Sequence, residues 1–105
     1  MTEAINGKII LTGFKLDPVE KSMIERIIRT YKHKIGEKIK YSEIRLRLKK
    51  SARGQTFLHE VQGVLLADKK YTSKMTDFNL LFAASEVLEK LMHGAEHNKS
   101  RKNQK

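Results

Sequence analysis

The sequence predicts an α+β fold, a two-layer sandwich of β-α-β-β-β-α order in which two helices pack on one face of a four-stranded sheet. Apolar residues recur at three- and four-residue steps in two stretches, which is typical of amphipathic helices. Between these stretches the apolar period changes to two, which is typical of half-buried strands. Since 39% of the 105 residues are apolar, the chain can fill one modest core. The apolar stripes of both helices need a common partner, and one face of a sheet supplies it.

The N-terminal part of the chain predicts a strand and a long helix. Residues 8–12 form a short apolar run, which we interpret as the first strand. A helix start follows, because Asp17 can cap free amides, Pro18 suits the first helical position, and Glu20 can reach back as in a capping box. We expect Gly36 to end this helix. Its apolar stripe consists of Met23, Ile24, Ile27, Ile28, Tyr31 and Ile35.

The period of two begins after Tyr41. Its apolar members are Ile44, Leu46 and Leu48, and its polar members are Glu43, Arg45, Arg47 and Lys49. This alternation predicts a strand with one buried face, so the three cations Arg45, Arg47 and Lys49 are expected on the opposite face of the sheet. Residues 51–55 indicate a turn. Residues 57–67 indicate a further strand, whose two faces the pattern does not assign.

The C-terminal part predicts a short fourth strand over residues 71–75, after a tight turn at residues 68–70. Asp77 or Asn79 is expected to cap the second helix. Its apolar stripe consists of Leu80, Leu81, Ala84, Val87, Leu88 and Leu91. We expect one domain over residues 1–97 and a basic, disordered tail over residues 98–105, since this last stretch is polar and has no acid.

Composition narrows the class of protein. The chain has no cysteine, so it has neither a disulfide framework nor thiol chemistry. No apolar run reaches the roughly 18–20 residues that a membrane span needs. The first seven residues lack the basic-then-apolar layout of a signal peptide. We therefore expect a soluble, cytoplasmic protein without a membrane partner, and a monomer when free.

Positive charge is concentrated in one part of the chain. Between Arg26 and Lys50 there are ten Lys or Arg residues and two acids, so +8 of the formal net charge of +10 lies in this stretch. Apolar residues run through it at regular spacing, so it is not a disordered basic tail. A folded surface with this charge favours a polyanion as its partner, and the nucleic acid backbone is the first candidate.

Several cations are candidate RNA contacts. In the first helix they are Arg26, Arg29 and Lys32, in the sheet Arg45, Arg47 and Lys49, in the turn Arg53, and in the tail Lys99, Arg101 and Lys102. Each has an ordinary alternative, because helix cations commonly form a solvated face and strand cations commonly prevent aggregation of a sheet. Tyr31 and Tyr71 could stack on bases, although their spacing favours half-buried packing.

Histidines raise the question of a metal site. His93 and His97 are four residues apart and would share a face of an intact helix, with Glu96 beside them. No cysteine completes a zinc site, and Gly94 weakens the helix that would align the two side chains. The sequence also lacks a catalytic triad order, paired carboxylates and a glycine-rich phosphate loop. We therefore expect no metal, no cofactor, no small-molecule substrate and no enzymatic activity.

Four stretches, taken in order, resemble one family. Residues 59–71 (HEVQGVLLADKKY) are similar to the third strand of short bacterial ribosome hibernation-promoting factors and the ribosome-associated inhibitor, the sigma-54 modulation protein family. Residues 79–85 and 89–91 resemble the last helix of that family, and residues 16–24 resemble the start of its first helix. The resemblance covers roughly residues 8–97. It departs from the family pattern at Gly63, at Ser85 and over residues 92–97, where a dense basic run is usual.

The resemblance implies a short-form factor that binds rRNA of the small ribosomal subunit, in the channel for messenger RNA and transfer RNA. Such a factor would inhibit translation in idle ribosomes, during stationary phase or stress, by steric occlusion. It also adds Lys90 to the candidate RNA contacts, since the family has a helix lysine there. Two alternatives stay open: a general binder of structured RNA, similar to double-stranded-RNA domains, and a regulator that binds an acidic protein or a sigma factor.

Overall fold

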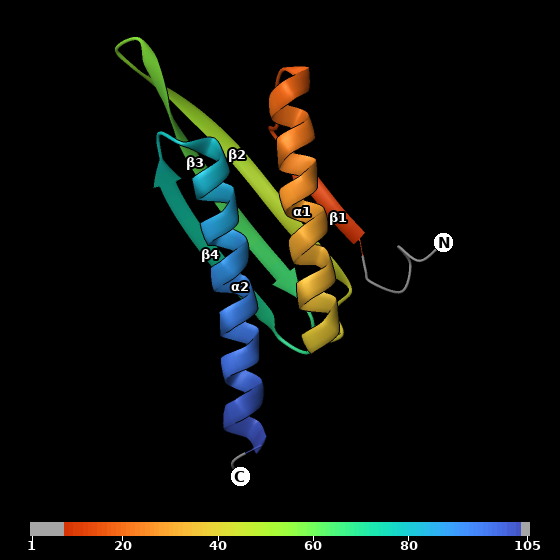
Figure 1. The fold of residues 1–105 in the computed structure, drawn as a ribbon. Coiled ribbons are helices and arrows are strands. Elements are labelled where there is room, and N and C mark those ends of the chain that lie inside the picture. Colours follow the sequence, from red (N-terminus) through yellow and green to blue (C-terminus); the bar gives the residue numbers. More distant parts are fainter. Residues whose placement is uncertain (1–7, 104–105) are drawn as a thin grey trace.

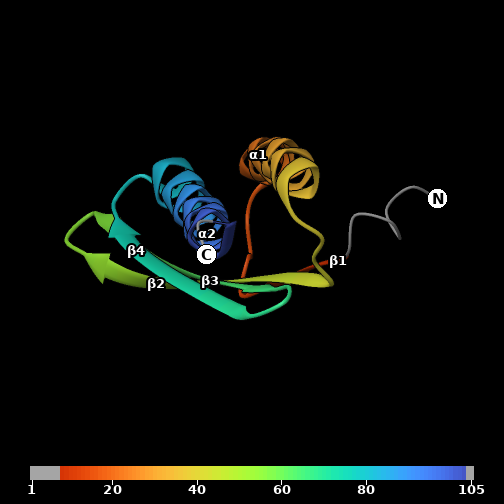
Figure 2. The same ribbon diagram turned by 90° about the horizontal axis from the view of Figure 1, so that it is seen from below.

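The computed structural model describes residues 8–103, with side chains described to residue 96, and its element order is the predicted β-α-β-β-β-α (Figure 1). The elements are β1 (Lys8–Thr12), α1 (Pro18–Lys38), β2 (Glu43–Arg53), β3 (Thr56–Leu66), β4 (Lys70–Asp77) and α2 (Leu80–Asn103). Figure 2 shows both helices on one face of the sheet, with the other face left open. The prediction of an α+β fold with this order is confirmed.

The four strands lie in the order β1-β2-β3-β4. Strand β1 runs parallel to β2, whereas β2, β3 and β4 pair antiparallel. The two helices run in the same direction. Tyr31 Oη donates to Glu89 Oε1 at 2.5 Å, and Lys38 Nζ lies 3.0 Å from Glu96 Oε2. The partners are 58 residues apart in the sequence in both contacts, as parallel helices require. The hydrogen bond from Lys38 also lowers the pKa of Glu96.

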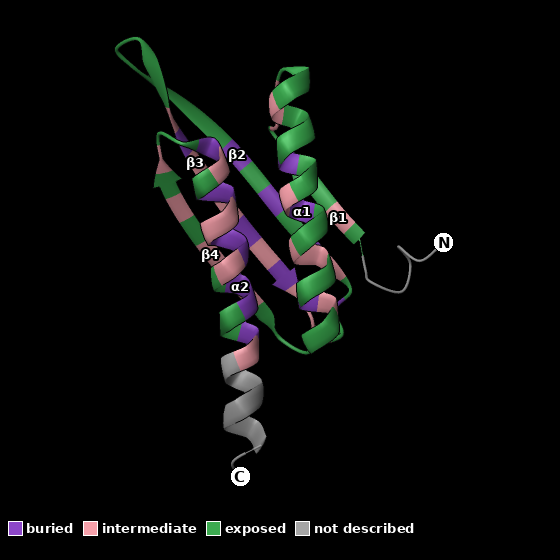
Figure 3. Cartoon of the chain, in the orientation of Figure 1, coloured by how far each residue is buried: buried purple, intermediate pink, exposed green. Residues whose placement is uncertain are grey.

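The core lies between the sheet and the helices. Ile44, Leu46 and Leu48 of β2 are buried, as the alternation predicts. Strand β3 supplies Val61 and Leu65 to the same side. The helices cover these residues with their apolar stripes (Figure 3), whose buried members are Ile24, Ile28, Ile35, Leu80, Ala83, Ala84, Val87, Leu88, Leu91, Met92 and Ala95. Met23, predicted for the stripe of the first helix, is instead 46% exposed.

Helix α2 packs closely on β3 at Gly63. A Cβ atom at this position would lie 2.5 Å from Val87 Cγ1 and 2.9 Å from Leu91 Cδ1. A second close approach involves Gly13 after β1, where φ is +79° and a Cβ would collide with the carbonyl oxygen of Leu48. The glycine at position 63 thus leaves room for the helix.

Three element boundaries differ from the predicted ones. Helix α1 continues through Gly36 to Lys38, because Ile35 and Ile39 on either side pack into the core and offset the roughly 1 kcal/mol cost of a helical glycine. The hairpin of β2 and β3 closes only at Arg53 and Thr56, so its turn is shorter than expected. Helix α2 continues to Asn103, whereas a disordered tail was expected from residue 98. The domain boundary at residue 97 stays a prediction.

The hydroxyl groups of two tyrosines have different surroundings. Tyr31 donates to Glu89, and this hydrogen bond, together with burial, raises the pKa of Tyr31 to about 12. Tyr41 is buried, and its hydroxyl has no hydrogen-bond partner among the described residues. Burial alone raises the pKa of Tyr41 to about 12. The Tyr31 hydroxyl therefore links the two helices, whereas the Tyr41 hydroxyl leaves a polar group unsatisfied.

We expect Gly63→Ala to lower the free energy of unfolding by about 1–3 kcal/mol, because the added methyl group overpacks the contact with Val87. Gly94→Ala is the matched control, since its Cβ would meet only Tyr71 Cδ1 at 3.8 Å, and it should stabilise α2 by about 0.5–1 kcal/mol. Urea unfolding measures both variants. Equal stabilities for the two variants would contradict the close approach of α2 to β3.

Tyr31→Phe and Tyr41→Phe should change the free energy of unfolding in different ways. Loss of the Tyr31–Glu89 hydrogen bond should cost about 1 kcal/mol at pH 8, whereas removal of the unpaired Tyr41 hydroxyl should be neutral or stabilising. Since the folded-state pKa of Tyr31 lies above its ordinary value of 10.0, its contribution is complete below pH 10 and is lost as pH rises towards about 12. Urea unfolding at pH 8 and pH 11 should therefore show a smaller alkaline loss for Tyr31→Phe than for the wild type. An unchanged loss would contradict this assignment.

Candidate nucleic-acid interface

The open face of the sheet gathers cations from three of the four strands, β1, β2 and β4. The pairing register places Arg45 beside Val64 and Thr72, and Arg47 beside Gln62 and Lys74. Paired residues of neighbouring strands point to the same side of a sheet, and residues two apart in one strand share a face. Ile44, Leu46 and Leu48 point to the helices. Arg45, Arg47 and the residues paired with them in the neighbouring strands therefore point away from the helices. We call the resulting set the sheet surface; its cations are Lys8, Arg45, Arg47, Lys49, Lys70 and Lys74.

All six cations of the sheet surface are exposed, and two acids share this face. Arg45 forms an ion pair with Glu43, and Lys74 Nζ lies 3.8 Å from Glu60 Oε2. Arg47 and Lys49 form no ion pair with any described residue. Six cations against two acids leave this face strongly positive, and its ammonium and guanidinium groups have the chemistry that binds anions.

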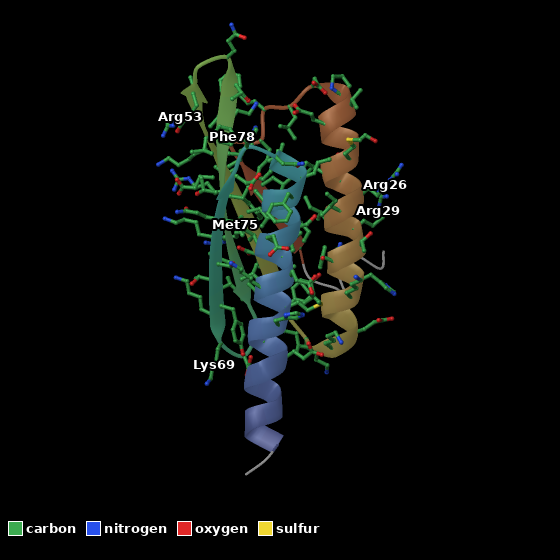
Figure 4. All side chains as sticks on the ribbon, turned by 60° about the vertical axis from the view of Figure 1, so that its left-hand side comes forward. Arg26, Arg29, Arg53, Lys69, Met75 and Phe78 are labelled. Carbon is green, nitrogen blue, oxygen red and sulfur yellow. The ribbon has the colours of Figure 1, made fainter. Side chains whose placement is uncertain are left out.

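The outer side of α1 is a weaker cationic surface. Arg26 and Arg29 are exposed there and point away from the sheet (Figure 4), and we call these two residues the helix surface. Lys32, the third predicted contact of this helix, is only half-exposed. On the same helix His33 Nε2 lies 3.1 Å from Glu37 Oε2, and Lys34 Nζ lies 5.1 Å from the centre of the Tyr31 ring.

The predicted contacts therefore do not form one footprint. In Figure 4, nitrogen-tipped side chains project from the open face of the sheet, and Arg26 and Arg29 project from the opposite side of the molecule. Arg53 lies at the tip of the β2–β3 hairpin, and Lys90 is exposed on α2. The predicted contacts Lys99, Arg101 and Lys102 lie beyond the described side chains.

The sequence interpretation missed two groups of residues. Lys8, Lys70 and Lys74 join the sheet surface only through strand pairing, which the alternation of one strand does not specify. Tyr31 and Tyr71, the aromatic residues weighed for base stacking, are half-buried, as their spacing favoured. The exposed aromatic residues are instead Phe57, Phe78 and Phe82, at 50%, 55% and 46% exposure.

The histidines have structural partners. His59 is buried, and its Nδ1 lies 2.9 Å from the carbonyl oxygen of Phe78, so it joins β3 to the segment before α2. His93 Nε2 lies 2.9 Å from Glu89 Oε2, and the side chain of His97 lies outside the described residues. Within the described part of the chain, no three His, Asp or Glu side chains gather as a metal-binding group. The described helices also include none that is long and apolar enough to cross a membrane.

The fold defines a small α+β protein whose sheet has one open, cationic face. Two solved structures have a similar fold. The chain is similar to a ribosomal subunit interface protein from Coxiella burnetii, with 16% identity, a TM-score of 0.53, and coverage of 93% of this chain and 99% of the other. It is also similar to the N-terminal domain of Protein Y from Thermus thermophilus, with 14% identity, a TM-score of 0.53, and coverage of 86% and 93% respectively. No protein-family model and no curated protein sequence matches the chain. At these identities the likeness establishes the fold, as the sequence resemblance predicted.

Proposed function

We propose that this protein binds the ribosome and holds it inactive, by occupying the channel for messenger RNA and transfer RNA on the small subunit. The observation that carries the proposal is the sheet surface, six exposed cations on a rigid β scaffold. The fold supports it, because one of the solved structures that share this fold is of a ribosomal subunit interface protein. The proposal places the protein in the cytoplasm, where ribosomes are.

The sheet surface suits rRNA better than the helix surface does. Arg45, Arg47 and Lys49 follow one another along β2 at steps of roughly 7 Å, the length of two strand residues. Each phosphate that such a cation neutralises releases condensed counterions, so the binding free energy grows with the number of contacts. Arg26 and Arg29 contact a second RNA segment in this arrangement, because they project from the opposite side of the molecule.

The proposed mechanism is steric occlusion without chemistry. The sandwich is rigid because its core is continuous from sheet to helices, so it holds its cations in fixed positions while it fills a site that transfer RNA would otherwise use. Arg53 and Lys90 are secondary candidate contacts at the hairpin tip and on α2, and Lys32, Lys99, Arg101 and Lys102 remain candidates as well. The free protein is proposed to be a monomer.

Co-sedimentation with purified small and large ribosomal subunits across a salt series tests the proposal. The wild type should pellet with small subunits, and excess transfer RNA or added salt should release it. Replacement of Arg45, Arg47 and Lys49 by Gln should weaken binding and lower the slope of log K against log salt concentration by roughly 2–3, since three phosphate contacts are lost. Thermal unfolding should be nearly unchanged, because the three side chains are exposed.

The matched control is the triple variant of α1, in which Arg26, Arg29 and Lys32 become Gln. It removes the same charge from the other side of the molecule and should weaken binding less. A sheet variant that binds normally, beside an α1 variant that does not, would show that the sheet surface is the wrong footprint. Equal binding to a naked RNA duplex and to small subunits would favour a general structured-RNA binder, and absence of pelleting at low salt would refute ribosome binding.

A further inference from the structure

The end of the β2–β3 hairpin projects beyond the helix layer. The two strands stay paired as far as Arg53 and Thr56, whereas α2 begins at Leu80 and packs on β3 at Gly63, seven residues further along the strand than Thr56. Residues 51–57 are all exposed, and Figure 3 shows this end of the hairpin as exposed on both strands. Side chains on the helix-facing side of this end are therefore not covered by a helix.

Phe57 is one of these side chains. It lies two residues before His59 in β3, so it shares the face of the sheet on which His59 is buried, yet it is 50% exposed. Lys50 Nζ lies 5.7 Å from the centre of the Phe57 ring, within the range of a cation–π contact. The same ammonium group donates to the carbonyl oxygen of Lys15 at 3.5 Å. A lysine thus sits over a phenyl ring that is half open to solvent.

Phe78 lies at the same end of the molecule. Its carbonyl oxygen is 2.9 Å from His59 Nδ1, and its side chain is 55% exposed. Because His59 pairs with Asp77 in the sheet, Phe78 follows directly after the last pair of β4 and lies near the residues that precede His59 in β3, which include Phe57. Figure 4 places Phe78 below the hairpin tip, on which Arg53 lies. Two exposed rings and two cations, which we call the hairpin platform (Lys50, Arg53, Phe57 and Phe78), therefore occupy one end of the protein. Lys50 and Phe57 lie on the helix-facing side of the hairpin, and Arg53 lies on its open side.

We infer that the hairpin platform stacks unpaired RNA bases on Phe57 and Phe78, while Lys50 and Arg53 contact the adjoining phosphates. The inference rests on the proposed function in taking RNA as the ligand, and it adds a class of contact that the cationic sheet surface does not provide. Exposed aromatic rings beside cations bind single-stranded nucleic acid because every base has a π face to stack on. Paired bases are already stacked within a duplex, so the platform selects loops and single strands.

The surroundings favour RNA over a protein partner. The acid on this face of the sheet is Asp77, opposite His59, and its Oδ1 already accepts the backbone amide of Asn79. The nearby ring of Phe82 differs, because Glu86 and Glu89 follow it at one and two turns along α2 and would repel phosphates. Phe82 therefore lies outside the platform and serves as a control of the same residue type and similar exposure.

The probe is a single-stranded RNA decamer with one central 2-aminopurine, whose fluorescence falls when the base stacks, compared with a duplex of the same length. The wild type should bind the single strand and quench its fluorescence. The double variant Phe57→Leu, Phe78→Leu should bind on the order of 10-fold more weakly and lose the quenching at saturation, since two stacking contacts are removed. Phe82→Leu should resemble the wild type. The Gln variant of Arg45, Arg47 and Lys49 should bind more weakly but still quench at saturation.

Several outcomes would overturn the inference. Unchanged affinity and quenching in the double variant would do so, and would leave the two rings as a candidate protein contact. Equal losses in Phe82→Leu would show that the effect is not specific to the platform. The two rings are at least half exposed, so the double variant should fold. If the double variant does not fold, Lys50→Gln provides a second variant, which should bind the single strand more weakly than the wild type does. If the wild type quenches the decamer but does not bind small subunits, base stacking on the platform is supported and ribosome binding is refuted. The two proposals can therefore fail separately.

Discussion

Burial of one face of β2 beneath the two helices is the constraint on which the rest of the structure depends. Ile44, Leu46 and Leu48 must point to the core, so Arg45 and Arg47 between them must point out. A slip of one residue in the pairing would exchange the two sets and bury the cations. The close contact of α2 with Gly63 fixes the register from the other side, because only a residue without a side chain lets the helix sit this low on β3.

The same constraint explains how the fold tolerates so much positive charge. Neighbouring cations on β2 are roughly 7 Å apart and exposed to water, where each repulsion costs well under 1 kcal/mol and is screened further by salt. Glu43 and Glu60 reduce the repulsion on this face. Stability therefore depends on the apolar side of the sheet. The exposed cations on the other side do not contribute to the core, so they can bind a partner without loss of stability.

The sequence predicts most of the fold and part of the candidate site, for identifiable reasons. The clean alternation in β2 assigns its two faces, and with them Arg45, Arg47 and Lys49. Strand β3 gives no such assignment, because Val64 and Leu66 lie on the open face, so both faces contain apolar residues. Lys70 and Lys74 of the neighbouring strand could be assigned only once the pairing register was known.

Two further features depend on tertiary contacts that no local pattern reports. Helix α1 passes through Gly36 because residues on both sides of it are held in the core. Phe57 and Phe78 come from separate elements, and they become neighbours because His59 joins β3 to the segment before α2. An apolar residue in a strand is expected inside, and its exposure at the projecting hairpin follows only from where α2 begins.

The central claim is that the open face of the sheet is the surface that meets rRNA. The most direct test measures the acetylation rate of individual lysines by mass spectrometry, with and without purified small ribosomal subunits. The account predicts stronger protection of Lys49 and Lys74 on the sheet surface than of Lys21 and Lys34 on α1. Protection of Lys21 and Lys34, with Lys49 and Lys74 unchanged, would contradict it.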